Sequence, residues 1–287
     1  MKNLRNPSIF TCLFLLVFIP LNAAAVPPPS PAGGNYLALD GVNDHAILDF
    51  ETFGLLLPKG TDEFTFEAWI YPTKLPDEDI LPMILSQQVR MYVWTRGQHG
   101  DFRLKSAVLL SRAVAHGEVS FGIVNKVPPN QWYHVALQGE GRRRTLIIND
   151  FMRISEGGTT LADDISHAEH PQAFTIGGFG EEIVSGMHGG LFWGHFSGYI
   201  DEVRISKVAR YSIAKGGLRP PEKRTKFKND AETVALWHFD EPRGTQKFSD
   251  TSGNAYHLVG KNGAQTDGTL AVEAEGKLAT IWGRLKQ

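Results

Sequence analysis

The chain has 287 residues, 42% apolar and 21% charged, which is ordinary for a folded globular protein. A formal net charge of −2 excludes the basic footprint typical of a protein that binds nucleic acid. Cys12 is the only cysteine, so a disulfide bond within the chain is excluded.

The first 25 residues are predicted to be a signal peptide. Lys2 and Arg5 form a basic start, residues 9–21 are apolar, and residues 23–25 are alanines suited to cleavage before Val26. The alternative, a retained anchor, is disfavoured because the apolar run is shorter than the roughly 20 residues that span a bilayer. We therefore expect a secreted protein, extracellular or periplasmic, with no transmembrane segment after cleavage.

Residues 26–34 are a proline-rich linker, expected to be extended and to hold the mature N-terminus away from the folded body. Residues 35–261 are predicted to form one β-domain, and residues 262–287 a C-terminal tail. Short strands are predicted at the start of the domain, at residues 36–40, 45–48, 64–71, 83–86, 89–94, 102–110 and 118–124. Residues 64–71 alternate most clearly, with Phe64, Phe66, Ala68 and Ile70 on one face and Glu67 and Trp69 on the other.

Residues 131–154 carry the strongest β signal in the chain. Two β-rich runs, 132–137 and 145–148, flank a turn that contains two glycines, and Asn149-Asp150 then reverses the chain into residues 151–154. The glycines and the β-branched run oppose a helix. A meander of this size must bury one face, so a second sheet is needed to cover it.

The later segments continue the β pattern. Strands are predicted at residues 173–176, 197–206 and 233–239, a glycine-rich loop at 180–194, and a helical turn at 208–212. Many short strands with almost no helical periodicity indicate an all-β sandwich or barrel.

Several segments in order resemble the LamG-like jelly-roll domain of the concanavalin A-like lectin/glucanase superfamily. They are YLALDGVNDHAILDF (36–50), FTFEAWIYPT (64–73), WYHVALQGEG (132–141), LIINDFMRIS (146–155), FTIGGF (174–179), FSGYIDEVRISKVARYS (196–212), TVALWHFDE (233–241) and DTSGNAYHL (250–258). The resemblance implies two antiparallel sheets packed face to face in a jelly-roll β-sandwich. Two features depart from it: Asp150 stands where the family commonly has Gly, and HFDE and DTSGN come last, as a closing strand or the stub of a second module.

Related domains often hold a structural calcium at the rim of the sandwich. The resemblance places its candidate ligands at Asp40, Asp44, Asp201, Asp250 and Asn254, because hard cations bind several oxygens from adjacent turns. The alternative is that Asp44, Asp250 and Asn254 cap turns. Asp201 falls inside a predicted strand, where Asp is disfavoured, so an ion or an arginine should compensate its charge.

A sugar-binding surface is the second prediction. Trp193 and His195 lie in the glycine-rich loop, and Trp69 and Glu67 share a strand face, so their rings and carboxylate could contact a sugar. For the strand aromatics, core packing is the alternative.

No pair of carboxylates at catalytic spacing and no nucleophile motif is found. We therefore expect a non-catalytic, secreted or cell-surface module that binds carbohydrate, with a structural calcium. A structural or adhesion module that binds another cell-surface protein is the alternative, and a glycoside hydrolase or lyase of the same fold is the third reading.

Overall fold

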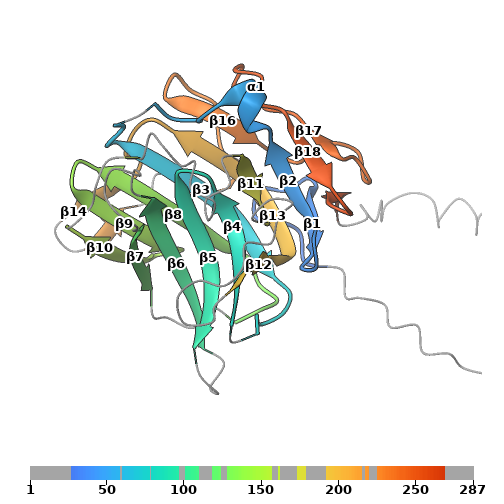
Figure 1. Ribbon diagram of the computed structural model, residues 1–287, viewed down its shortest axis with the longest axis horizontal. Coiled ribbons are helices and arrows are strands. Elements are labelled where there is room, and N and C mark those ends of the chain that lie inside the picture. Colours follow the sequence, from blue (N-terminus) through green and yellow to red (C-terminus); the bar gives the residue numbers. More distant parts are fainter. Residues whose placement is uncertain are drawn as a thin grey trace, which may run out of the picture.

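The computed structural model describes residues 27–58, 60–77, 79–96, 101–109, 118–123, 128–156, 161, 173–178, 192–214, 217–219 and 225–268. Within these residues the chain is almost entirely β-strand, and the one helix is the single turn α1, Phe50–Phe53. Two stacked sheets form a sandwich, with strands β4 to β7 in front in the view of Figure 1. The predicted all-β antiparallel sandwich is therefore confirmed.

Sheet A has the strand order β10-β9-β8-β3-β13-β1-β19, and β16 also pairs with β13. Its strands are β1 (Tyr36–Asp40), β3 (Phe64–Pro72), β8 (Tyr133–Glu140), β9 (Arg143–Ile148), β10 (Phe151–Ser155), β13 (Ser197–Ser206), β16 (Thr233–Trp237) and β19 (Gln265–Asp267). These described strands pair with one another in antiparallel fashion.

Sheet B has the order β17-β18-β2-β11-β4-β5-β6-β7, and β12 pairs in parallel with β4. Its strands are β2 (His45–Leu48), β4 (Ile80–Ser86), β5 (Val89–Arg96), β6 (Asp101–Leu109), β7 (Glu118–Ile123), β11 (Phe174–Ile176), β12 (Phe192–His195), β17 (Lys247–Phe248) and β18 (Leu258–Lys261). A separate hairpin joins β14 (Ser212–Ala214) and β15 (Gly217–Arg219).

The main core lies between the two sheets. From β3 it takes Phe64, Phe66, Ala68 and Ile70, the face that the alternation predicted. Sheet B contributes alternate residues of β5, namely Val89, Met91 and Val93. The opposite face of β3 is also buried, so both sides of sheet A are covered at its centre.

The predicted meander forms β8, β9 and β10, and its second turn keeps a two-residue loop despite Asp150. Phe151 pairs directly with Ile148, and only Asn149 takes a positive φ, of 49°. Its backbone N–H donates to the His134 carbonyl at 2.8 Å. The first turn residue therefore takes the left-handed conformation, which Asn tolerates, and Asp150 does not have to.

The helical turn predicted at residues 208–212 is absent from these described residues. The Thr65 hydroxyl instead donates to the Val208 carbonyl at 2.7 Å and accepts from the Arg210 N–H at 3.1 Å. These bonds hold the chain in an extended path across the outer face of sheet A. The prediction was wrong because contacts with the sheet replace the local hydrogen bonds of a helix.

Both ends of the predicted domain also differ from expectation. Pro27 and Ser30 are buried, and the Trp132 indole donates to the Pro28 carbonyl at 2.9 Å, so the linker packs on the body rather than pointing away. It packs beside a cluster of four aromatic rings on the outer face of sheet A: Tyr36, Tyr71, Trp132 and Tyr199. At the other end, β19 extends sheet A to Asp267, inside the range expected to be tail. As expected for a closing strand, β16 joins β13.

Candidate ligand-binding site

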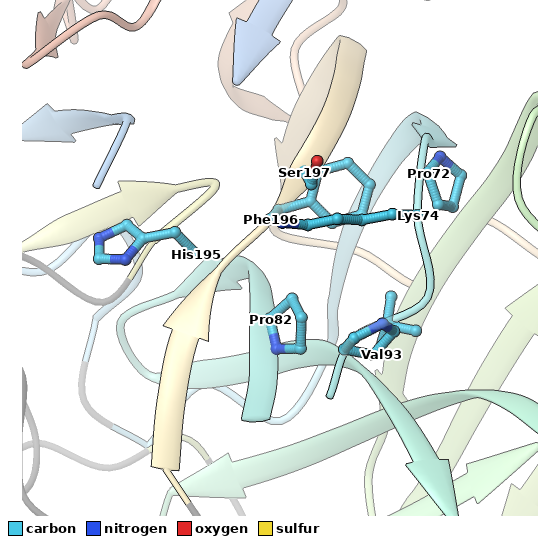
Figure 2. Close-up of a pocket in the computed structure, with 8 residues that line it drawn as sticks. Pro72, Lys74, Pro82, Val93, His195, Phe196 and Ser197 are labelled. Carbon is cyan, nitrogen blue, oxygen red and sulfur yellow. The ribbon is translucent and has the colours of Figure 1, made fainter. Parts of the chain in front are cut away.

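A small pocket opens at the rim where the chain passes from sheet B to sheet A. The space between its walls is about 250 Å³ when the adjoining open solvent is included. Figure 2 shows His195 on one side, Pro72 on the other, and Phe196 and Ser197 between them. The lining residues are Pro72, Lys74, Pro76, Pro82, Val93, His195, Phe196 and Ser197.

The wall at His195–Ser197 is built by the crossover between β12 and β13. His195 ends β12, where it lies opposite Met83 of β4, and Ser197 begins β13. Between them Phe196 turns into the core, and its N–H donates to the Gly177 carbonyl at 2.8 Å. The crossover therefore fixes two polar side chains at the rim while an aromatic ring anchors the backbone beneath them.

The opposite wall follows the end of β3. The Thr73 N–H donates to the Ser197 carbonyl at 3.0 Å, and the Thr73 and Ser197 hydroxyl oxygens lie 2.9 Å apart. Gly198 makes this approach feasible, because its φ is 144° and a Cβ there would overlap the Tyr71 carbonyl oxygen. The two walls are therefore tied together at the base of the pocket.

The chemistry of the pocket suits a small ring that carries hydroxyl groups. Proline, valine and phenylalanine give apolar walls and Ser197 supplies a hydroxyl group, while the His195 ring points away from the other lining residues (Figure 2). Lys74 is exposed and has no ion pair with any described residue, and no described carboxylate lines the pocket.

His195 is the one predicted ligand-binding residue that lines this pocket. Burial lowers the pKa of His195, and the neighbouring His45 lowers it further, against the opposing charges of Asp40 and Asp44. The imidazole is therefore neutral at pH 7, with one nitrogen that can accept a hydrogen bond.

Trp193 lies in β12 rather than in a loop, and it is 4% exposed. Its ring packs on the outer face of sheet B, with the Arg90 guanidinium carbon 4.3 Å from the ring centroid and Tyr92 edge-on at 5.3 Å. Its ring is therefore not open for stacking on a sugar. The loop assignment was wrong because pairing with β4 turned the end of the glycine-rich segment into a strand.

Glu67 and Trp69 lie on the outer face of sheet A, where the segment that follows β13 covers them. The Trp69 indole donates to the Thr225 carbonyl at 3.2 Å, and the Glu67 side chain is 0% exposed. Packing against neighbouring groups, the alternative weighed for strand aromatics, describes Trp69. In this structure neither side chain is accessible to a ligand.

Glu67 instead anchors a buried polar cluster that sequence reasoning missed. Its Oε1 accepts from Arg204 Nε at 2.7 Å and Nη2 at 2.6 Å, and its Oε2 lies 3.3 Å from His134 Nε2 and accepts from the Tyr211 hydroxyl. Burial by itself would raise the pKa of Glu67, but the hydrogen bond with His134 and the charge of Arg204 outweigh it and lower the pKa to about 2. Charged residues on neighbouring strands were the available signal, but the strand order was needed to group them.

The Asp40 and Asp44 carboxylates, predicted as calcium ligands, cap the turn between β1 and β2. Asp40 Oδ1 accepts from the Val42 N–H at 2.7 Å. Asp44 accepts from the Asp40 N–H at 3.1 Å and the Gly263 N–H at 2.6 Å. These hydrogen bonds agree with the alternative that such side chains cap turns.

Asp250 and Asn254 also hold a turn, at residues 250–256. Each Asp250 oxygen accepts two hydrogen bonds, from Leu236 N, Ser252 N, Ser252 Oγ and Tyr256 N. The Asn254 amide donates to the Val234 carbonyl at 2.9 Å. The turn is thereby locked against β16.

Asp201 is fully buried on the outer face of sheet A, and its Oδ1 accepts from the adjacent Glu202 N–H at 2.8 Å. Its Oδ2 has no hydrogen-bond partner among the described residues. Burial raises the pKa of Asp201 well above its usual value, the contact with Ser30 opposes this, and Glu202 and Asp240 raise it further. No arginine compensates it among these described neighbours.

The five predicted ligands do not form one calcium site. Asp40 lies opposite Ser197, four residues from Asp201 along β13, which is about 13 Å at strand spacing. Among the residues that the structure describes, no group of three or more His, Cys, Asp or Glu side chains is placed to hold a metal. Calcium needs six to eight oxygen ligands, so this donor set does not fit the ion.

Comparisons with known proteins place the chain in one family. The family model described as the Concanavalin A-like lectin/glucanases superfamily matches residues 40–212. No curated protein matches the chain. Within the described part, no helix is long and apolar enough to cross a membrane.

Among solved structures, a native heptameric SAP-like pentraxin from Limulus polyphemus is 14% identical, with 81% of this chain and 96% of that chain covered and a TM-score of 0.44. The Ruminococcus gnavus IT-sialidase CBM40, bound to alpha2,3 sialyllactose, is 12% identical over 60% of this chain and 90% of its own (TM-score 0.40). Domains LG4-5 of the mouse laminin alpha1 chain are 11% identical over 69% and 48% (TM-score 0.39). Likenesses this distant say nothing about the ligand.

Proposed function

The chain belongs to the Concanavalin A-like lectin/glucanases superfamily, and from this premise we propose that it is a non-catalytic module that binds carbohydrate in the rim pocket. The observation that carries the proposal is the pocket itself, which combines apolar walls with Ser197, the edge of His195 and an exposed Lys74 that has no ion pair within the described residues. A sugar ring has apolar C–H faces and polar edges, and this lining offers a surface for each.

The non-catalytic part of the proposal is supported by where the carboxylates lie. Glycoside hydrolysis by the usual route needs two carboxyl groups on either side of the scissile bond. No described carboxylate lines the rim pocket, and Glu67 is held ionised and inaccessible by Arg204. Incubation with a polysaccharide panel is expected to release no reducing sugar. Release by the wild type would revive the hydrolase reading.

A glycan array tests the binding itself. The purified protein is expected to bind a limited set of glycans, and Lys74→Ala is expected to weaken that binding about tenfold, the loss of roughly 1.4 kcal/mol. Lys247→Ala is the matched control, because Lys247 is an exposed lysine on β17, outside the pocket. Binding that resists Lys74→Ala would move the site away from the pocket.

The alternative function, adhesion to another cell-surface protein, is favoured by a different surface. Among the described strands β10 lies at an edge of sheet A, and its Phe151 and Ile154 are 62% and 39% exposed. Exposed apolar side chains on an unpaired edge are typical of strand-mediated contacts. No glycan bound on the array, together with cell adhesion that is lost in Phe151→Ser, would favour this reading.

Calcium stays a separate hypothesis in this proposal. Asp201 is the predicted ligand with a buried oxygen that has no hydrogen-bond partner within the described residues. The melting temperature in calcium against chelator tests it, since an ion that binds only the folded state raises the melting temperature. Because the donor set does not fit, we expect no shift in melting temperature.

Secretion is a separate expectation. It is tested by measuring whether the protein is found in the culture medium, the periplasm or the cells.

A further inference from the structure

Two histidine rings from different strands of sheet B lie close together beside the rim pocket. His45 begins β2 and is 1% exposed, and His195 ends β12. Their ring centroids lie 5.8 Å apart with an interplanar angle of 42°. Gly178 packs directly against both, and a Cβ there would crowd the His195 ring edge and the His45 Cβ.

Each ring has one nitrogen whose hydrogen-bonding capacity is unused. Within the described residues, His45 Nε2 and His195 Nε2 are buried and have no hydrogen-bond partner. A buried polar atom without a partner costs about 1–3 kcal/mol, so such atoms usually mark a water or an ion. Because the two Nε2 atoms belong to adjacent rings, we infer that one water or ion binds both.

The tautomer of His45 narrows the choice of occupant. Its Nδ1 lies 3.0 Å from the Asn43 carbonyl oxygen, which can only accept, so Nδ1 carries the proton and Nε2 presents a lone pair. A histidine that ligates a metal typically donates its other N–H to a backbone carbonyl in this way. A neutral His195 likewise presents a lone pair at Nε2 when its Nδ1 carries the proton.

From this arrangement we propose that His45 and His195 bind one borderline divalent transition-metal ion, such as Zn²⁺, Ni²⁺ or Cu²⁺, through their Nε2 atoms. With metal–nitrogen bonds of about 2.0–2.1 Å, two imidazoles on one ion place their ring centroids about 5–6.5 Å apart. The observed 5.8 Å falls inside this interval. Water completes the coordination, since no third described side chain converges there.

The ion would join β2 to the crossover that forms one wall of the rim pocket. Imidazole favours zinc, copper and nickel, whereas calcium and magnesium favour oxygen. The site is thus distinct from the calcium hypothesis in both place and chemistry. His195 also lines the rim pocket but His45 does not, so variants at His45 test the metal site apart from the proposed sugar binding.

Calorimetry and thermal unfolding of the purified chain, with Zn²⁺ as the probe, test the proposal. We expect one Zn²⁺ per chain lost in both His45→Ala and His195→Gln, and a rise in melting temperature of roughly 5–10 °C at 100 times the dissociation constant. Calcium should give no such rise. His257→Ala, which removes an exposed histidine elsewhere, should keep both effects.

Cu²⁺ electron paramagnetic resonance on the wild type guards against variants that fail to fold, and two coordinated imidazole nitrogens are expected. Zinc binding that survives His45→Ala would overturn the proposal. A wild-type protein that binds no zinc would also overturn it. In that case a water that bridges the two Nε2 atoms would satisfy them. If His45→Ala loses zinc but still binds sugar, the loss of the metal site is distinguished from a failure of the rim pocket.

Discussion

The rim pocket and the Glu67 cluster contain the same kinds of side chain, but the two groups differ in what these side chains contact. Each has a cation, a histidine and a hydroxyl group: Lys74, His195 and Ser197 in the pocket, and Arg204, His134 and Tyr211 around Glu67. Around Glu67 these groups contact one buried carboxylate and are sealed from solvent. In the pocket Lys74 is exposed, and the Ser197 hydroxyl lies 2.9 Å from that of Thr73. A buried counter-charge, rather than the kinds of side chain present, separates the structural cluster from the candidate binding site.

The largest expected effect comes from breaking the sealed cluster. Glu67→Gln leaves Arg204 without its counter-charge beneath the covering segment, and we expect a loss of about 3–5 kcal/mol in the free energy of unfolding. Denaturant unfolding measures it. The matched control is Glu140→Gln, which removes an exposed partner of Arg143 and should cost less than about 1 kcal/mol. Equal losses in the two variants would contradict the comparison.

Acid should weaken the same cluster. The pKa of Glu67 is about 2 in the folded state against 4.5 without the fold, so its contribution is complete above pH 4.5 and is lost as the pH falls toward 2. That difference corresponds to about 3 kcal/mol. Stability curves of the wild type and Glu67→Gln should converge across this interval, as followed by denaturant midpoints at stepped pH. Parallel curves would mean that the carboxylate is not the titrating group.

Asp201 sharpens the comparison, because it is buried like Glu67 but forms no ion pair within the described residues. Its folded pKa is raised, so its favourable contribution is present below pH 3.8 and is lost as the pH rises through the folded pKa. Asp201→Asn is therefore expected to stabilise the protein at pH 7 by about 1–2 kcal/mol, and to do so less at pH 4. A destabilised variant that no longer responds to calcium would instead support an ion at this position.

The smallest effect on stability is expected at the pocket. Lys74→Ala removes an exposed side chain without a described partner, so the free energy of unfolding should change by no more than about 0.5 kcal/mol. Thermal unfolding beside the glycan array measures both properties. A large loss of stability would show that Lys74 belongs with the structural residues.

The sequence predicted the parts of this molecule that depend on local pattern. Alternation placed Phe64 and Phe66 in the core, and the Asn149-Asp150 turn set the register of β9 and β10. The strand β19 was missed because QTD carries no apolar alternation, and it pairs only because residues 245–266 return the chain to β1.

Burial on the outer face of sheet A could not be predicted, because it depends on a segment distant in sequence. Nothing near Glu67 signals that Tyr211 will reach it from 144 positions away. The same reason explains why Trp69 was a candidate ligand contact. His195 was predicted, but its partner His45 was not, since strand pairing alone brings them together.

Residues 27–34 precede the first strand but pack on the sandwich, so the folded unit includes residues that lie outside its strands. A chain trimmed to start at residue 35 would keep β1 and every other strand, yet it would uncover the Trp132 indole and take Ser30 from Asp201. Such a truncation should express less soluble protein than one that starts at Val26. Boundaries for expression and for fusion to other proteins should therefore follow buried surface rather than hydrogen-bonded ladders.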